Sequence, residues 1–290
     1  MSESSQLIAL ITGATSGIGE VTARELARQG AHIVLLARNA EKAEAARRAI
    51  SAAAGHSRVD VLLCDLADLS QVRRAAAEFL ARYDQLDLLI NNAGLLFGAT
   101  REATAEGNEM TLATNHLGHF LLTALLLDRL RQSPTARIIN VASTAYKMAR
   151  PDFQDLQATR SYGPMQQYGN TKLYNILFTQ ELARRLRAAG ISNVTVNSVH
   201  PGVVATGFGS QSGGLMSLGV KLLRPFLLTP EQGAATSIFL ATDPGMASVS
   251  GGHFEKKKAV PVKSPYTTPQ YAQQLWEESE RLVGQRFKVS

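Results

Sequence analysis

The stretch TGATSGIG, residues 12–19, follows an apolar run and precedes a segment with helical spacing. Its glycines, Gly13, Gly17 and Gly19, leave no side chain where a backbone must approach a pyrophosphate at a helix N-terminus. The spacing G-x-x-x-G-x-G differs from the commoner G-x-G-x-x-G, and three glycines can also simply form a tight turn. Because the stretch lies between a strand and a helix near the N-terminus, we interpret it as a nucleotide-binding turn.

The same alternation of short apolar runs and helical segments continues along the chain. We predict strands at 7–12, 32–37, 58–64, 86–91, 137–143 and 194–199, and helices at 18–29, 41–54, 70–82, 108–131 and 166–189. Strands that alternate with helices at this spacing predict an α/β fold with a doubly wound parallel sheet, flanked by helices on both faces.

Helix ends support this division of the chain. Gly30, Gly55 and Gly190 follow three of the helical segments, where a left-handed residue commonly ends a helix. Thr229 with Pro230 and Gln232 predicts the capped start of a later helix. No repeat or shift in composition marks a boundary, so we expect a single domain over 1–290, with a core at about 7–254 and a C-terminal extension at 255–290.

Composition excludes several classes of function. The net charge is +6 and the pI about 9.5, but the arginines are scattered and the longest basic run is only Lys256–Lys258. A nucleic-acid site would cluster positive charge and interleave aromatic residues, so we expect no nucleic-acid partner. The single cysteine, Cys64, excludes an internal disulfide and is compatible with a reducing compartment.

Targeting signals are not evident either. Residues 1–6, MSESSQ, lead directly into the first predicted strand, so we expect no secretory signal or membrane anchor and a cytoplasmic protein. The most apolar segment, 112–130, contains Asn115, His116 and His119 and ends in charged residues. It is typical of a buried or interface helix and not of a membrane span.

The end of the second predicted strand discriminates between cofactors. An acidic residue at this place would bind a ribose 2′-hydroxyl, but the strand ends with Ala37 and Arg38. A guanidinium suits a 2′-phosphate and can stack on adenine, although an exposed arginine at a strand end is also common. We therefore expect NADP(H) and not NAD(H).

Two further features have alternative interpretations. His116 and His119 have the spacing of a helical metal-ligand pair, but no third ligand is evident, so core or subunit-interface histidines are favoured. The Gly/Ser-rich segment 207–219 fits a mobile lid or a plain surface loop.

Seven motifs now occur in one order. They are TGATSGIG, CDLADL at 64–69, NNAG at 91–94, TNHLGHF at 114–120, Ser143 after a strand, YGNTK at 168–172 and HPGVVAT at 200–206. Together they resemble the short-chain dehydrogenase/reductase superfamily and its Rossmann-like fold, over about residues 7–254. The long interval between Ser143 and Tyr168, with HLGHF and HPGVV, resembles the retinol dehydrogenase-like branch.

The resemblance assigns roles to four residues. It implies that Tyr168 is the proton donor in carbonyl reduction and the acceptor in alcohol oxidation. It also implies that Lys172 holds the nicotinamide ribose, that Ser143 polarises the carbonyl, and that Asn115 anchors a water chain leading to Lys172. Taken alone, Tyr168 and Lys172 would be a half-buried phenol beside a snorkelling surface lysine.

Electrostatics explains why these two groups would be paired. An ammonium about 6 Å from a phenol, at an effective dielectric of about 20, contributes roughly 3 kcal/mol. That energy corresponds to about two pKa units, so the phenol pKa would fall toward about 8 before desolvation opposes it. A pKa near 8 suits general acid–base catalysis.

The resemblance also implies the cofactor contacts. These are Thr12, Gly13, Ser16, Gly17, Ile18, Gly19, Arg38, Asp65, Leu66, Asn92, Ala93, Gly94, Tyr168, Lys172, Pro201, Gly202, Val204 and Thr206. By composition alone, NNAG and HPG are also ordinary turns.

We therefore expect an NADP(H)-dependent oxidoreductase that interconverts a hydrophobic aldehyde or ketone and its alcohol. The apolar residues of the lid region suggest the hydrophobic substrate: Leu215, Met216, Leu218, Val220, Leu222 and Leu223. The alternative is an NADP(H)-binding regulatory or sensor protein with little or no turnover. Helices 108–131 and 166–189 are candidate contacts in a homo-oligomer, as the resemblance implies.

Overall fold

The computed structural model describes residues 7–202 and 228–289. In this part of the chain the central element is an eight-stranded sheet with the order β3-β2-β1-β4-β5-β6-β7-β8. The strands are β1 (Ile8–Thr12), β2 (His32–Ala37), β3 (Val59–Leu63), β4 (Leu88–Asn91), β5 (Ala136–Val141), β6 (Val194–His200), β7 (His253–Glu255) and β8 (Lys258–Ala259). All neighbouring pairs are parallel except β7 and β8, which form an antiparallel hairpin.

The sheet has a switch point between β1 and β4. From β1 the chain proceeds to one side through β2 and β3, then returns to place β4 on the other side of β1. In open α/β sheets, ligands bind beyond the carboxyl ends of the strands at such a point. The turn at 13–16 follows β1 directly and therefore lies at this position.

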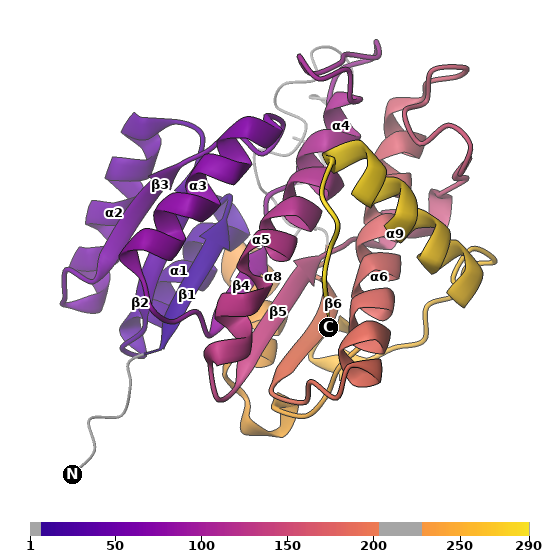
Figure 1. The fold of residues 1–290 in the computed structure, drawn as a ribbon. Helices are drawn as coiled ribbons and strands as arrows, with labels where there is room; N and C mark the ends of the chain where they lie inside the picture. Colours follow the sequence, from indigo (N-terminus) through magenta and orange to yellow (C-terminus); the bar gives the residue numbers. More distant parts are fainter. Residues whose placement is uncertain (1–6, 203–227, 290) are drawn as a thin grey trace.

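Helices cover both faces of the sheet (Figure 1). Their bounds are α1 Gly17–Arg28, α2 Ala40–Ala54, α3 Leu69–Arg82, α4 Met110–Leu112, α5 Gly118–Gln132, α6 Pro164–Ala188, α8 Pro230–Thr242 and α9 Pro269–Val283. One hydrophobic core joins the sheet to α1, α2 and α8, and a larger core joins it to α3, α5, α6 and α9. The predicted fold class is confirmed.

Local signals in the sequence correspond closely to these elements. The six predicted strands are confirmed, with bounds that differ by at most two residues. Gly30, Gly55 and Gly190 have φ angles of 94°, 73° and 70°, so all three adopt the left-handed conformation expected after a helix. Thr229 and Gln232 form a reciprocal capping box at the start of α8.

The predicted helix 108–131 is not a regular α-helix. Between α4 and α5 the chain forms a π-helical segment, Ala113–Leu117, and this segment contains Asn115. By length and composition the stretch Met110–Gln132 would suffice to cross a membrane, but 83% of its most apolar window is buried inside the fold. The burial agrees with the core-helix interpretation.

The C-terminal helix α9 packs on α6 and on the π-helical segment (Figure 1). Its Trp276 is 1% exposed and lies against Phe120 of α5, with the ring centroids 5.2 Å apart, and stacks on Phe287 at 4.7 Å. The guanidinium of Arg185 lies 4.3 Å from the Trp276 ring centroid. Residues 269–289 therefore complete the larger hydrophobic core.

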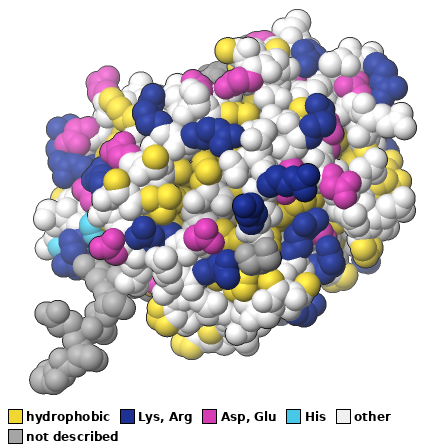
Figure 2. Space-filling view, in the orientation of Figure 1, with side chains coloured by type: hydrophobic (Ala, Val, Ile, Leu, Met, Phe, Trp, Pro, Cys, Tyr) yellow, Lys and Arg dark blue, Asp and Glu magenta, His cyan; other side chains and the backbone are white. Residues whose placement is uncertain are grey.

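The position of α9 bears on the expected subunit contacts. It covers part of the surface that α6 and the π-helical segment would offer to a second subunit. On the face shown in Figure 2, Lys and Arg side chains lie among acidic and apolar ones. Pairing of subunits through 108–131 and 166–189 would have to accommodate α9.

Replacing Trp276 with alanine should lower the free energy of unfolding by about 3–5 kcal/mol, because a large buried ring is lost and a cavity remains. Urea denaturation followed by circular dichroism measures the change. Gln274→Ala, at an exposed position of α9, is the matched control and should change the stability by less than about 0.5 kcal/mol. Equal effects of the two substitutions would contradict the packing described for α9.

Candidate active site

The turn after β1 is held against the segment that follows β4. A Cβ on Gly13 would lie 2.8 Å from the Cα of Ala93, and a Cβ on Gly19 would lie 2.5 Å from the Asn92 side-chain nitrogen. Gly13 also has a φ of 65°, which disfavours other residues. These glycines are therefore required by the close approach of two loops, in addition to any approach of a phosphate.

Thr12 joins the same two loops by hydrogen bonds. Its hydroxyl oxygen accepts from the backbone N–H groups of Asn92 and Ala93, both at 2.9 Å. The Asn92 amide group donates to the carbonyl oxygens of Thr12 at 2.9 Å and Gly13 at 3.2 Å. The structure thus brings together the cofactor-contact candidates of the first and fourth strand ends.

The N-terminus of α1 is open to a ligand. Ser16 is its exposed N-cap residue and makes no hydrogen bond to the helix through its side chain, and Ile18 follows in the first turn, half-buried. Uncapped backbone N–H groups at a helix N-terminus bind phosphate readily. The residues present therefore fit the pyrophosphate of a dinucleotide.

The candidate adenine end is built from β2 and β3. Ala37 ends β2 in a buried position, and Arg38 is exposed in the turn before α2. Asp65 follows β3, and its carboxylate accepts from the Ala67 N–H at 3.0 Å. Leu66 is buried, and its carbonyl contacts the point where a Cβ on Gly118 would stand, so Leu66 packs against the start of α5.

Ser143, Tyr168 and Lys172 meet beyond the carboxyl end of β5. Ser143 caps a short 3₁₀-helix, Thr144–Met148, and its hydroxyl oxygen accepts from the Ala145 N–H at 3.2 Å. Tyr168 on α6 is 8% exposed and is hydrogen-bonded to the Ser143 side chain. The Lys172 Nζ donates to the Val141 carbonyl at 3.3 Å and lies 5.4 Å from the Tyr168 ring centroid.

Because Gly94 has no side chain, the Lys172 ammonium can lie directly beside it. A Cβ on Gly94 would lie 2.8 Å from the Lys172 Nζ and 3.7 Å from the Asn115 Oδ1. The NNAG segment therefore adjoins the Tyr168–Lys172 pair on one side and the glycine turn on the other. The glycine turn, the NNAG segment and the Tyr168–Lys172 pair therefore form one continuous site.

Asn115 is fully buried, and its side chain is engaged in holding the site together. Its Oδ1 accepts from the Leu95 N–H at 2.8 Å, and its Nδ2 donates to the Leu95 carbonyl at 2.9 Å and the Thr171 hydroxyl at 3.2 Å. It thus connects the NNAG segment to the residue before Lys172. A water chain from Asn115 to Lys172 stays a prediction.

The ionisation of the pair differs from the sequence-based expectation. Burial raises the pKa of the Tyr168 phenol to about 12, and the hydrogen bond with Ser143 acts in the opposite direction. Burial also lowers the pKa of the Lys172 ammonium to about 8. The fall toward about 8 was expected before desolvation, and in the structure desolvation is the largest influence on the phenol pKa.

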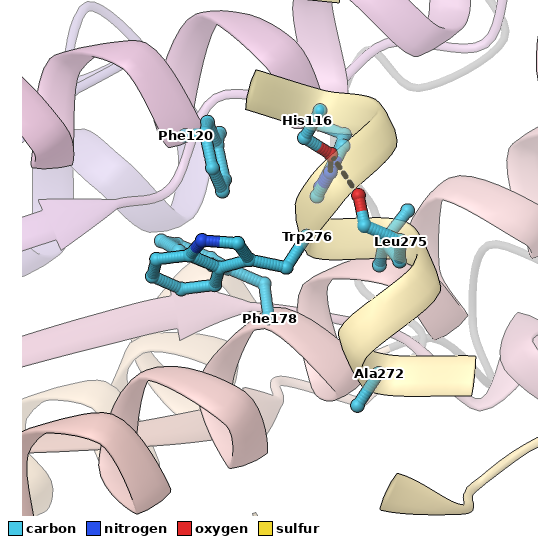
Figure 3. Close-up of a pocket in the computed structure, with 7 residues that line it drawn as sticks. His116, Phe120, Phe178, Ala272, Leu275 and Trp276 are labelled. Atoms are coloured by element: carbon cyan, nitrogen blue, oxygen red, sulfur yellow. Dashed lines mark hydrogen bonds between the residues drawn. The ribbon is translucent and has the colours of Figure 1, made fainter. Parts of the chain in front are cut away.

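The two helical histidines are core residues. The His119 Nε2 lies 2.9 Å from the Thr12 hydroxyl oxygen and its Nδ1 lies 3.2 Å from the Asn115 carbonyl, and burial lowers its pKa to about 3. His116 contacts Asn175 and Ser279, and burial lowers its pKa to about 4. Figure 3 shows His116 beside α9, among the rings of Phe120, Phe178 and Trp276.

Sequence reasoning missed the contacts that two histidines make with the site residues. His119 ties the π-helical segment to Thr12, and its position four residues after Asn115 was the available signal. His200, the first residue of HPGVVAT at the end of β6, accepts a hydrogen bond from the Thr144 N–H at 3.2 Å, and no local pattern indicated this contact.

The last candidate contacts follow β6. Pro201 and Gly202 are half-buried, and Gly202 has a φ of 89° beside the side chain of Leu228. Val204, Thr206 and the predicted lid at 207–219 lie outside the described residues. The structure therefore places only the start of this segment.

Comparisons with known proteins agree with this geometry. A family model described as short chain dehydrogenase matches residues 7–213. Mouse retinol dehydrogenase 11 is 42% identical over 277 residues, which cover 96% of this chain and 86% of the mouse protein.

Solved structures extend the likeness to the fold. An uncharacterised protein from Mycobacterium paratuberculosis has a TM-score of 0.77 and 34% identity, with coverage of 98% of this chain and 95% of that one. A 3-ketoacyl-(acyl-carrier-protein) reductase from Brucella melitensis, complexed with NADH, has a TM-score of 0.64 and 26% identity, over 85% of this chain and 95% of that one.

The fold, the site and these matches define an oxidoreductase acting on CH–OH groups with a nicotinamide cofactor. The chain belongs to the short-chain dehydrogenase/reductase family, in its retinol dehydrogenase-like branch.

Proposed function

We propose that this protein is an NADP(H)-dependent reductase of hydrophobic aldehydes or ketones, which also oxidises the corresponding alcohols. The observation that carries the proposal is the buried Tyr168–Lys172 pair beside Ser143, next to an open helix N-terminus at the switch point of the sheet. When bound, the reduced nicotinamide supplies the hydride.

Tyr168 gives its phenolic proton to the carbonyl oxygen. Because its pKa is raised to about 12, the phenol is protonated at neutral pH and the proton is available for reduction. Ser143 donates a second hydrogen bond to the same oxygen. The Ala145 N–H holds the Ser143 oxygen in place, and a hydroxyl donor at this position stabilises the developing negative charge.

Lys172 stabilises the phenolate that remains after proton transfer. Its ammonium is buried within reach of the Tyr168 ring, where the effective dielectric is low and the attraction strong. Its remaining N–H groups would hold the ribose hydroxyls of the cofactor.

The substrate class is supported by apolar side chains at the ends of the elements that carry Ser143 and Tyr168. Met148 closes the 3₁₀-helix that begins after Ser143, and Met165 lies three residues before Tyr168 on α6. Their exposed fractions are 47% and 40%, unusual for large apolar residues in the described part of the chain. The retinol dehydrogenase relatives, named for an apolar alcohol, support the same class.

Steady-state reduction of a panel of apolar aldehydes and ketones, including retinal, tests the proposal. We expect carbonyl-dependent oxidation of NADPH that increases with the apolar surface of the substrate. Tight binding of NADPH with no turnover on any member would instead favour the sensor function.

Arg38 should determine the preference for NADPH. Arg38→Asp is expected to lower the ratio of kcat/KM with NADPH to that with NADH by about tenfold or more, because a charge-assisted contact to the 2′-phosphate becomes a repulsion. Arg48→Asp, at an exposed position of α2, is the matched control and should leave the ratio unchanged. An unchanged ratio in Arg38→Asp would contradict the role of Arg38.

We also expect a cytoplasmic location and a homo-oligomer. The single, buried Cys64 is compatible with the reducing cytoplasm. Cell fractionation tests the location, and a mass measurement in solution tests the oligomer. Finding only monomer at micromolar concentration would contradict the oligomer.

A further inference from the structure

His200 lies at the end of β6, directly beside the turn that carries Ser143. Its Nδ1 accepts a hydrogen bond from the Thr144 N–H at 3.2 Å. Thr144 is the first residue of the 3₁₀-helix, and the next N–H, that of Ala145, is bonded to the Ser143 hydroxyl oxygen. The first two N–H groups of this helix are therefore satisfied by two side chains, one of which comes from a neighbouring strand.

The chemistry of this contact fixes the state of the imidazole. A backbone N–H can only donate, so the Nδ1 of His200 must carry a lone pair and the ring must be neutral with its proton on Nε2. An imidazolium has N–H groups at both positions and would face the Thr144 N–H with another donor. Protonation of His200 therefore breaks this contact.

The surroundings keep the ring neutral at physiological pH. Burial lowers the pKa of His200 below its ordinary value, the Glu255 carboxylate of β7 opposes this shift, and the ammonium of Lys147 adds to it. The other titratable groups near this corner in the described part of the chain are His253 on β7, whose pKa burial lowers to about 4, Tyr146 in the 3₁₀-helix and Tyr168 on α6.

We propose that His200 is a positioning residue for the reaction. Its unprotonated Nδ1 fixes the Thr144 N–H, and the fixed turn holds the Ser143 hydroxyl against Tyr168. His200 acts through Ser143, and the inference rests on the proposed carbonyl reductase function.

Two substitutions separate the role of His200 as a hydrogen-bond acceptor from its change of protonation. In His200→Asn, the Oδ1 can accept from the Thr144 N–H but does not titrate, whereas His200→Leu offers no acceptor. At pH 7.5 we expect kcat of His200→Asn within about threefold of wild type and a loss of about 10- to 100-fold in His200→Leu, with KM for NADPH little changed in both.

The pH profile is the readout that a merely structural role would not change. Because the pKa of His200 is lowered, wild-type kcat should fall only at a pH below the ordinary histidine pKa of about 6.5, as the ring gains a proton. His200→Asn should lack this acid limb. His56→Asn, on a loop after α2, is the matched control and should keep the wild-type profile.

An NMR titration of the Thr144 backbone amide tests the contact independently of turnover. The amide should shift with the ionisation of His200 in wild type and not in His200→Asn. The proposal would be overturned if His200→Leu had the kcat of wild type and kept the acid limb. It would also be overturned if the wild-type Thr144 amide did not shift with pH. Should His200→Leu fail to fold, the Asn variant and the amide titration decide. If the wild-type protein showed no turnover, the proposed function would be overturned. The amide titration would still show whether His200 Nδ1 accepts from the Thr144 N–H.

Discussion

Replacing Tyr168 with phenylalanine is expected to lower kcat by about a thousandfold or more while NADPH still binds. The substitution removes only the hydroxyl group, and a positioned acid contributes about 10²–10⁴-fold to a proton-transfer step. The ring keeps its buried position on α6, so the cofactor site should remain intact. Steady-state kinetics measures kcat, and fluorescence titration measures the binding of NADPH.

Tyr174 offers a matched control on the same helix. It is fully buried, and its hydroxyl oxygen has no hydrogen-bond partner among the described residues. Tyr174→Phe should therefore retain wild-type kcat and at least wild-type stability, since removing an unsatisfied buried hydroxyl group has no cost. Wild-type turnover in Tyr168→Phe would show that another group supplies the proton.

Replacing Lys172 with methionine is expected to have the second largest effect, a loss of about a hundredfold or more in kcat together with weaker binding of NADPH. The substitution removes a buried ammonium beside the Tyr168 ring and the donor to the Val141 carbonyl. The phenolate left after proton transfer then lacks its counter-charge in a desolvated site.

The pKa of Lys172 also predicts the direction in which the rate of reduction changes with pH. Lys172 has a lowered pKa of about 8, so its ammonium is present below pH 8 and is lost as the pH rises above it. Wild-type reduction of a carbonyl should therefore fall above about pH 8, and Lys172→Met should lack this alkaline limb. Lys263→Met, which replaces an exposed lysine, is the control. The same alkaline limb in Lys172→Met would contradict the assignment.

The sequence was sufficient to predict the parts of the fold that depend on local chemistry. Alternating apolar runs and helical spacing located the parallel strands, and Gly55 located a helix end, because a left-handed backbone strongly favours glycine. The constellation of Ser143, Tyr168 and Lys172 was also predictable, since a strand end and one helical turn bring the three side chains to one place.

Features that depend on long-range packing could not be predicted. The π-helical segment at Asn115 involves no unusual residue type, because only the hydrogen-bond register changes. The hairpin of β7 and β8 turns through Lys256 and Lys257, with φ angles of 48° and 63°, where Asn and Gly are the expected signal. The contact of His200 with Thr144 joins positions 56 residues apart.

Burial also explains why the phenol pKa does not fall toward 8 in the structure. The sequence gives the distance between Tyr168 and Lys172 along a helix, but it does not give the degree of desolvation. With Tyr168 8% exposed and Lys172 2% exposed, the cost of burying each charge dominates both pKa values.

Transfer of deuterium from NADPH labelled on the transferable position of its nicotinamide tests the central claim most directly. The wild-type protein would be incubated with the labelled cofactor and an apolar aldehyde, and the product analysed by mass spectrometry, with Tyr168→Phe beside it. We expect an alcohol that carries one deuterium on the former carbonyl carbon, formed by wild type and almost absent with Tyr168→Phe. An unlabelled alcohol, or equal labelled product from both proteins, would contradict hydride transfer with Tyr168 as the acid.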